Sequence, residues 1–142
     1  MPHWLRAVLA IVAAFIAWFA VATVGNLAIR AWLPGYAQVE KAMGFSLGML
    51  LARLVLGAGA SLAAGAACAA IARSARWAVH VSWLLLLALF VPVHMNLWAK
   101  FPAWYHIIFL GSLVALVIVG ARLTGRRLVA PGGPVAAGVS KR

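Results

Sequence analysis

Two histidines, His94 and His106, are the side chains of this sequence best suited to bind a ligand or to exchange a proton. They lie six residues on either side of Lys100, in a stretch that also contains Pro92 and Pro102 and separates two long apolar runs. A tight antiparallel hairpin that turns near Lys100 places both imidazoles at the same depth. Because an imidazole can donate, accept or titrate near neutral pH, we expect a polar layer here.

Arg53 is a charged residue inside an apolar run, and Gly57, Ser61 and Gly65 follow it at intervals of four. Small residues at this spacing let helices approach closely in lipid, so we predict a helix-packing role for Gly57, Ser61 and Gly65. Arg53 shares that ridge and should point to the packed side, where a charge needs polar partners. It is either a structural anchor or a contact for a ligand.

Several runs bring a polar side chain to the same outer layer. An arginine there attracts an anion or a carbonyl group, so we predict a small outward-facing polar pocket. The alternative is a purely structural role, in which these side chains form hydrogen bonds only with lipid head groups, water or one another near the membrane–water interface. The predicted ligand-binding residues are Arg53, His94, Asn96, His106, Asn26 and Tyr105.

Metal, cofactor and catalytic sites are not predicted. Two histidines without a third ligand make a poor zinc site. Haem ligation by His94 and His106 is an alternative, because helical bundles hold cofactors between facing histidines, but a very short turn leaves little room for a porphyrin. The chain has one acid, Glu40, and one cysteine, Cys68. Without a carboxylate pair or a visible nucleophile–base pair, we expect no enzyme activity.

The elements that position these residues are membrane spans. The chain has 142 residues, of which 67% are hydrophobic and 9% charged. A soluble domain is about half apolar and about a quarter charged, and a small domain has too much surface to bury this excess. We therefore predict an all-α integral membrane four-helix bundle with short loops, in a domain of residues 1–123. The expected spans are about 7–29, 45–72, 77–98 and 102–121, and 124–142 is expected to be a flexible basic tail.

The first apolar run also admits a second interpretation, a secretory signal cleaved after Ala20-Val21-Ala22. The apolar run continues beyond that site, and Trp18 and Phe19 are bulky for a signal core. A membrane span is the favoured interpretation.

The net charge of +11 indicates an orientation in the membrane. The basic residues stand at the ends of apolar runs, as orientation signals do, so we expect no nucleic-acid partner. The positive-inside rule puts both termini in the cytoplasm of a plasma membrane or a bacterial-type inner membrane, with the hairpin outside. One side carries Arg6, Arg73, Arg76, Arg122, Arg126, Arg127, Lys141 and Arg142, and the other carries Arg30, Lys41 and Lys100.

Three functions fit these observations. The favoured one is a non-enzymatic membrane subunit or interaction protein, which packs through the Gly57-Ser61-Gly65 ridge against a second copy or another membrane protein. The alternative is a small permease or binder for a small or lipophilic molecule, which uses the outward-facing polar pocket. A haem electron-transfer protein that uses His94 and His106 is the third.

Overall fold

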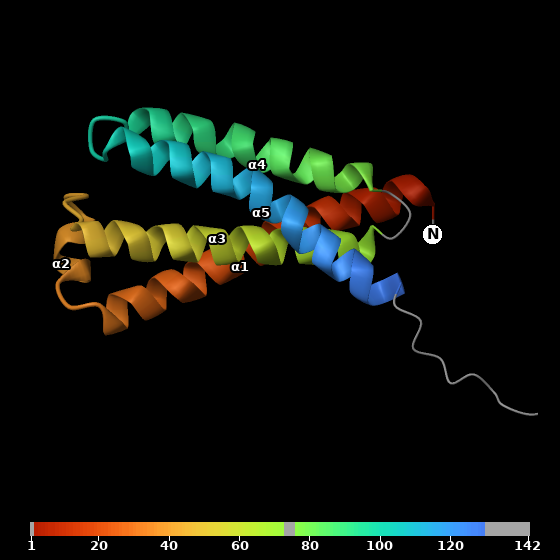
Figure 1. The fold of residues 1–142 in the computed structure, drawn as a ribbon, viewed down its shortest axis with the longest axis horizontal. Helices are drawn as coiled ribbons and strands as arrows, with labels where there is room; N and C mark the ends of the chain where they lie inside the picture. The colour runs from red at the N-terminus through yellow and green to blue at the C-terminus, as the bar shows by residue number, and fades with distance from the viewer. Residues whose placement is uncertain (1, 73–75, 130–142) are drawn as a thin grey trace, which may run out of the picture.

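The protein is an all-helical bundle, as the sequence predicts. The computed structural model describes residues 2–72 and 76–129. Its helices are α1 (His3–Trp32), α2 (Tyr36–Glu40), α3 (Leu47–Ile71), α4 (Trp77–Asn96) and α5 (Ala103–Val129). All of these except the short α2 are long and apolar enough to cross a membrane. Figure 1 shows α2 and the α4–α5 turn at one end of the bundle, called here the α2 end, and the N-terminus at the other.

Local sequence signals explain where these helices begin. Ser46 is the N-cap of α3, and its hydroxyl accepts a hydrogen bond from the backbone N–H of Met49 at 3.4 Å. This bond satisfies one of the donors that a helix start leaves free. Pro102 precedes α5, where its missing N–H removes no helical hydrogen bond, and its carbonyl accepts from Tyr105 N–H at 2.9 Å.

Small side chains bring α1 and α3 together. The buried residues of α1 recur three or four positions apart and end at Trp18, and they face alanines, Ser61 and Cys68 on α3. Trp18 Nε1 donates to Ser61 Oγ at 3.3 Å, and Ser61 Oγ donates to the Gly57 carbonyl at 2.8 Å. The buried α1 residues are Ala7, Ala10, Ala14 and Trp18.

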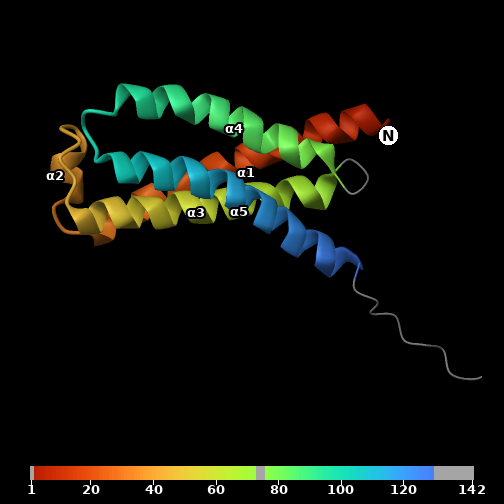
Figure 2. The same cartoon turned by 45° about the horizontal axis from the view of Figure 1, so that its top comes forward.

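The contact between α3 and α5 is closer still, and Figure 2 shows α5 crossing over α3. A Cβ on Gly65 would overlap the carbonyl oxygen of Val117, and a Cβ on Gly120 would overlap that of Leu62. The two backbones therefore touch where each helix has a glycine, as small-residue helix pairs do in lipid.

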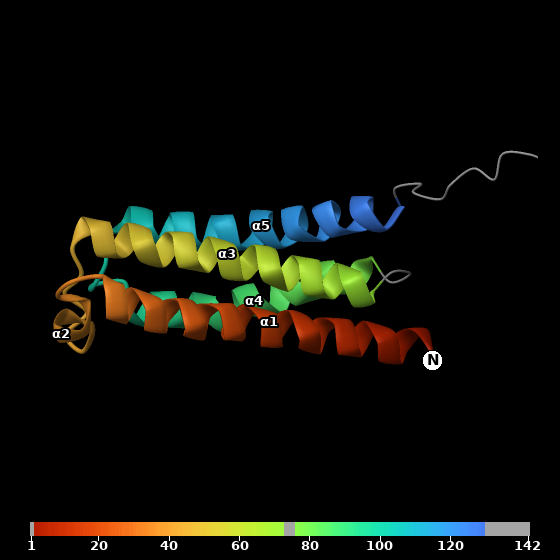
Figure 3. The same cartoon turned by 90° about the horizontal axis from the view of Figure 1, so that it is seen from below.

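Large apolar side chains face outward along the long helices. Ile16 is 64% exposed, Val55 73% and Ile107 67%. A soluble bundle buries such residues, whereas lipid covers them at no cost. Figure 3 shows α1 with its long side uncovered by the rest of the chain. The length of the four helices and their apolar outer faces make this a small membrane protein.

The helix bounds differ from the predicted spans chiefly in α5. A flexible tail is predicted from residue 124, but α5 continues to Val129. The basic residues Arg122 and Arg126 are compatible with a helix that leaves the membrane, and Thr124 Oγ1 donates to the Gly120 carbonyl at 3.1 Å. The rest of the predicted tail, 130–142, lies outside the described residues.

Candidate functional site

The segment after α1 folds back into the bundle. Gly35 follows Pro34 with φ of +79°, a left-handed conformation that glycine adopts without strain. This turn carries Tyr36, the first residue of α2, to a fully buried position. Its ring stacks on Phe45 with centroids 5.0 Å apart. A short helix outside the predicted spans thus delivers a phenol to the interior of the α2 end.

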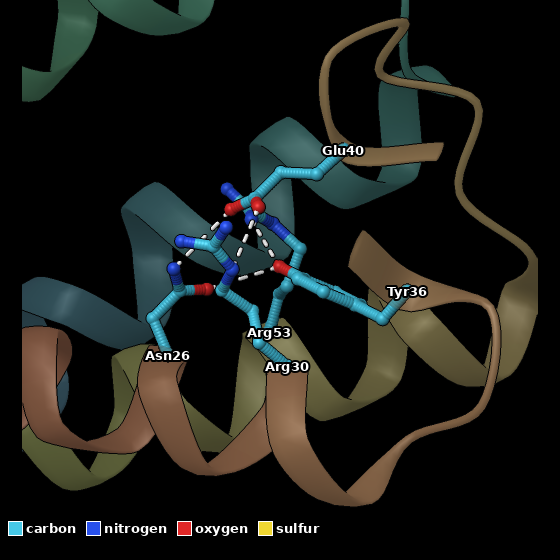
Figure 4. Close-up of polar contacts among 5 residues, drawn as sticks. All are labelled: Asn26, Arg30, Tyr36, Glu40 and Arg53. Atoms are coloured by element: carbon cyan, nitrogen blue, oxygen red, sulfur yellow. Dashed lines mark hydrogen bonds and ion pairs between the residues drawn. The ribbon is translucent and has the colours of Figure 1, made fainter. Parts of the chain in front are cut away.

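A chain of polar contacts links α1, α2 and α3 at this end (Figure 4). Arg30 Nε lies 3.2 Å from Glu40 Oε2, and Asn26 Nδ2 donates to Glu40 Oε1 at 3.3 Å. Tyr36 Oη donates to Asn26 Oδ1 at 3.1 Å and accepts from Arg53 Nη1 at 2.6 Å. The one acid of the sequence therefore pairs with Arg30, and Arg53 receives only neutral partners.

Arg53 keeps unused binding capacity. Its guanidinium carbon lies 4.8 Å from the centre of the Phe45 ring, a cation–π contact, and Tyr105 interacts with it electrostatically. Arg53 Nε is buried and has no hydrogen-bond partner among the described residues. A buried cationic donor without a partner is costly, so an acceptor that reached this atom would be stabilising.

A cavity of about 320 Å³ lies beside Arg53, where α1, α3, α4 and α5 meet at the α2 end. Its polar lining comprises Asn26, Glu40, Arg53, His94 and Tyr105. The apolar lining includes four aromatic side chains, Trp18, Phe90, Phe101 and Phe109. A concave, mostly apolar cavity with a few convergent polar groups is the usual form of a small-molecule site.

The two hairpin histidines form a hydrogen-bonded pair. Their Nδ1 atoms are 2.8 Å apart, and His106 is fully buried under Trp98, with ring centroids at 4.8 Å. His106 Nε2 is buried and has no hydrogen-bond partner in the described part of the chain. A buried N–H without an acceptor is rarer than an unused lone pair, which favours His106 with its proton on Nδ1. With that tautomer, His94 accepts at Nδ1 and carries its proton on Nε2, and the His94 side chain lines the cavity.

The distance of 2.8 Å between the two Nδ1 atoms is a hydrogen-bond distance. In this arrangement the two histidines bind each other through Nδ1. Haem ligation by His94 and His106 stays a prediction. Among residues 2–72 and 76–129, no three His, Cys, Asp or Glu side chains come together as a metal site.

The structure brings four of the six predicted ligand-binding residues to the cavity: Asn26, Arg53, His94 and Tyr105. His106 lies behind His94 and does not line it. Asn96 is exposed at the end of α4 and does not line it either. Two helical positions turn the chain by about 200°, so Asn96 faces away when His94 faces in.

The predicted packing ridge is buried inside the chain itself. Gly57 lies against the Phe109 ring, Ser61 bonds Trp18, and Gly65 meets the backbone of α5. All three residues are therefore covered by α1 and α5 of the same molecule.

Tyr36 and Phe45 were not predicted to belong to the site. Their signal in the sequence is weak, since Tyr36 lies in the connection between two predicted spans and Phe45 is the first residue of the second. The Pro34-Gly35 turn signal predicts a reversal but not which side chain it buries. Glu40 was noted only as the single acid of the chain.

Comparison of this chain with family models, with curated proteins and with solved structures finds no match.

Proposed function

We propose that this protein is a multi-pass protein of a cell membrane that binds a small molecule through an anionic or carbonyl oxygen in the cavity at the α2 end. The observation that carries the proposal is Arg53, which lines that cavity and whose buried Nε donor has no hydrogen-bond partner among residues 2–72 and 76–129. The aromatic walls would hold the apolar part of the ligand.

The electrostatics of the cavity support an anion or a carbonyl group. Arg53 brings a positive charge, and Glu40, the one carboxylate on the lining, is already paired with Arg30 and Asn26. The His94 tautomer derived above adds a second donor, and Tyr105 adds a phenol. The ligand oxygen would therefore meet donors from both α3 and α4.

The hypothesis that the protein is a membrane subunit stays a prediction, but the interface with its partner cannot be the one predicted from the sequence. The Gly57-Ser61-Gly65 ridge lies within the bundle, so a second copy or another membrane protein would have to contact a different face. The absence of enzyme activity also stays a prediction.

Native mass spectrometry of the gently solubilised full chain tests the proposal. Benzoate, a small aromatic carboxylate, serves as an added probe beside any adduct that is retained from the cell. We expect a monomer with a reproducible small adduct or saturable binding of benzoate. Arg53→Gln should weaken this binding by at least roughly tenfold, as loss of a charged hydrogen bond does.

Tyr36→Phe is the matched control. It removes the hydroxyl that accepts from Arg53 but leaves the guanidinium at the cavity. We expect it to retain most of the binding. Equal losses in Arg53→Gln and Tyr36→Phe would assign the effect to structure, and a wild-type protein that binds neither an adduct nor benzoate would contradict the proposal.

A further inference from the structure

A second cavity, of about 610 Å³, is lined by residues from the last turns of α3, the first turns of α4 and the last turns of α5. These turns lie at the end of the bundle opposite α2 (Figure 1). Small side chains form much of its lining, and a Cβ on Gly125 would meet nothing within 4 Å. The small lining residues are Ala69, Ala72, Ala121 and Gly125.

Basic groups from two helices converge on this cavity. Arg76 and His80 are four residues apart at the start of α4, and Arg122 and Arg126 are four residues apart on α5. Residues at this spacing share one face of a helix. Two basic faces therefore border a cavity that small residues leave open.

The positive charge of the second cavity has no acidic counterpart. The one acid of the sequence, Glu40, lies at the α2 end and pairs with Arg30. Within the part of the chain that the structure describes, the guanidinium groups of Arg76, Arg122 and Arg126 form no hydrogen bond or ion pair. Three uncompensated cations around one cavity attract a phosphate-bearing anion.

His80 is held ready as a further donor. Trp83 Nε1, which can only donate, bonds His80 Nδ1 at 3.2 Å. In the neutral ring the proton then resides on Nε2. His80 is exposed, so this N–H can reach an acceptor in the cavity.

We propose that this second cavity binds the head group of an anionic phospholipid, with its phosphate among Arg76, Arg122 and Arg126. The cavity lies where the apolar spans end, which is the level of the head groups. Basic pockets between membrane helices bind such head groups. A zwitterionic phosphatidylcholine fits less well, because its ammonium group would meet the same three arginines.

Native mass spectrometry of the full chain in detergent, with added dioleoylphosphatidylglycerol or dioleoylphosphatidylcholine, tests this inference. We expect one tightly retained phosphatidylglycerol and weaker retention of phosphatidylcholine. Arg122→Gln combined with Arg126→Gln should weaken phosphatidylglycerol binding by at least roughly tenfold. Arg76→Gln, on the other helix, should weaken it in the same direction and serves if the double variant does not fold.

The matched control is the double variant Lys41→Gln with Lys100→Gln. Both lysines are exposed at the α2 end and line neither cavity, so the control removes the same number of charges away from the site. Phosphatidylglycerol binding within about twofold of wild type in this control supports the site. An equal loss in the control would mean attraction to net charge alone and would overturn the inference. Displacement of phosphatidylglycerol by inorganic phosphate would identify a site for free phosphate and would overturn the lipid assignment. Equal retention of phosphatidylcholine and phosphatidylglycerol would also overturn the inference.

Discussion

Arg53 is held by a phenol and an aromatic face because the chain has no second carboxylate for it. Glu40 pairs with Arg30 at the edge of the bundle, where the carboxylate is 25% exposed and the arginine 47%. Arg30, which has a carboxylate partner, is thus more exposed to solvent than Arg53, which has none. The deeper charge faces a cavity instead, which is a suitable arrangement for a binding group.

Asn26 is the residue whose loss should disturb the α2 end most. Its amide joins Glu40 to Tyr36, so Asn26→Ala leaves both partners short of a hydrogen bond. We expect a loss of about 1–3 kcal/mol in the free energy of unfolding, measured by thermal unfolding in detergent. Glu40→Gln keeps an acceptor for Asn26 and removes only a partly exposed ion pair, so it should cost less than about 1 kcal/mol. The reverse ranking would contradict this account.

Spacing predicts some of these residue contacts and misses others. His94 and His106 are equidistant from Lys100, which places them at one depth, and the structure joins them at 2.8 Å. The partner of Arg53 could not be predicted, because the position of Tyr36 depends on the backbone angles of a turn. The prediction that Asn96 lines the pocket considers only its depth in the membrane. Because Asn96 is two positions after His94 on the same helix, its side chain faces the opposite side of α4.

The length of the apolar runs predicts the long helices of this protein, but it does not predict which helices pack together. Four long apolar runs suffice to predict four spans, because backbone in lipid must be helical. Which helix lies against the Gly57-Ser61-Gly65 ridge is a different question. Small residues permit a close contact without specifying the partner, so the pairing of α3 with α5 was beyond the sequence.

Gly65→Ala tests the α3–α5 contact. The added methyl group would collide with the Val117 carbonyl, which belongs to a helix backbone and cannot turn aside. We expect a loss of about 1–3 kcal/mol in the free energy of unfolding, as overpacking causes. Gly59→Ala is the control, since a Cβ there meets nothing within 4 Å. It should be neutral or stabilising by up to about 1 kcal/mol, through better helix propensity. Similar effects of the two variants in thermal unfolding would contradict the contact.

The two ends of the whole molecule differ in how their charges are arranged. At the α2 end, Arg30 has a carboxylate partner, whereas the arginines of the second cavity have none. Unpaired basic residues at the end of apolar spans favour the cytoplasmic side. We therefore expect the α2 end to face outward.

Cysteine labelling tests this orientation. In a Cys68→Ser background, Ala99→Cys places one thiol in the exposed α4–α5 turn, and Pro2→Cys places one before α1. Neither change alters the charge of the chain. A membrane-impermeant maleimide should label Ala99→Cys in intact cells and Pro2→Cys only after permeabilisation. The opposite pattern would reverse the orientation.

On α3, the glycine contact with α5 lies between the residues that line the two cavities. Gly57 lines the cavity at the α2 end, Ala69 lines the second cavity, and Gly65 touches the backbone of α5 between them. If α5 tilts as a rigid body about this contact, its two ends move in opposite directions. A tilt that widens one cavity would then narrow the other, so binding in one cavity would change the volume of the cavity on the other side of the membrane.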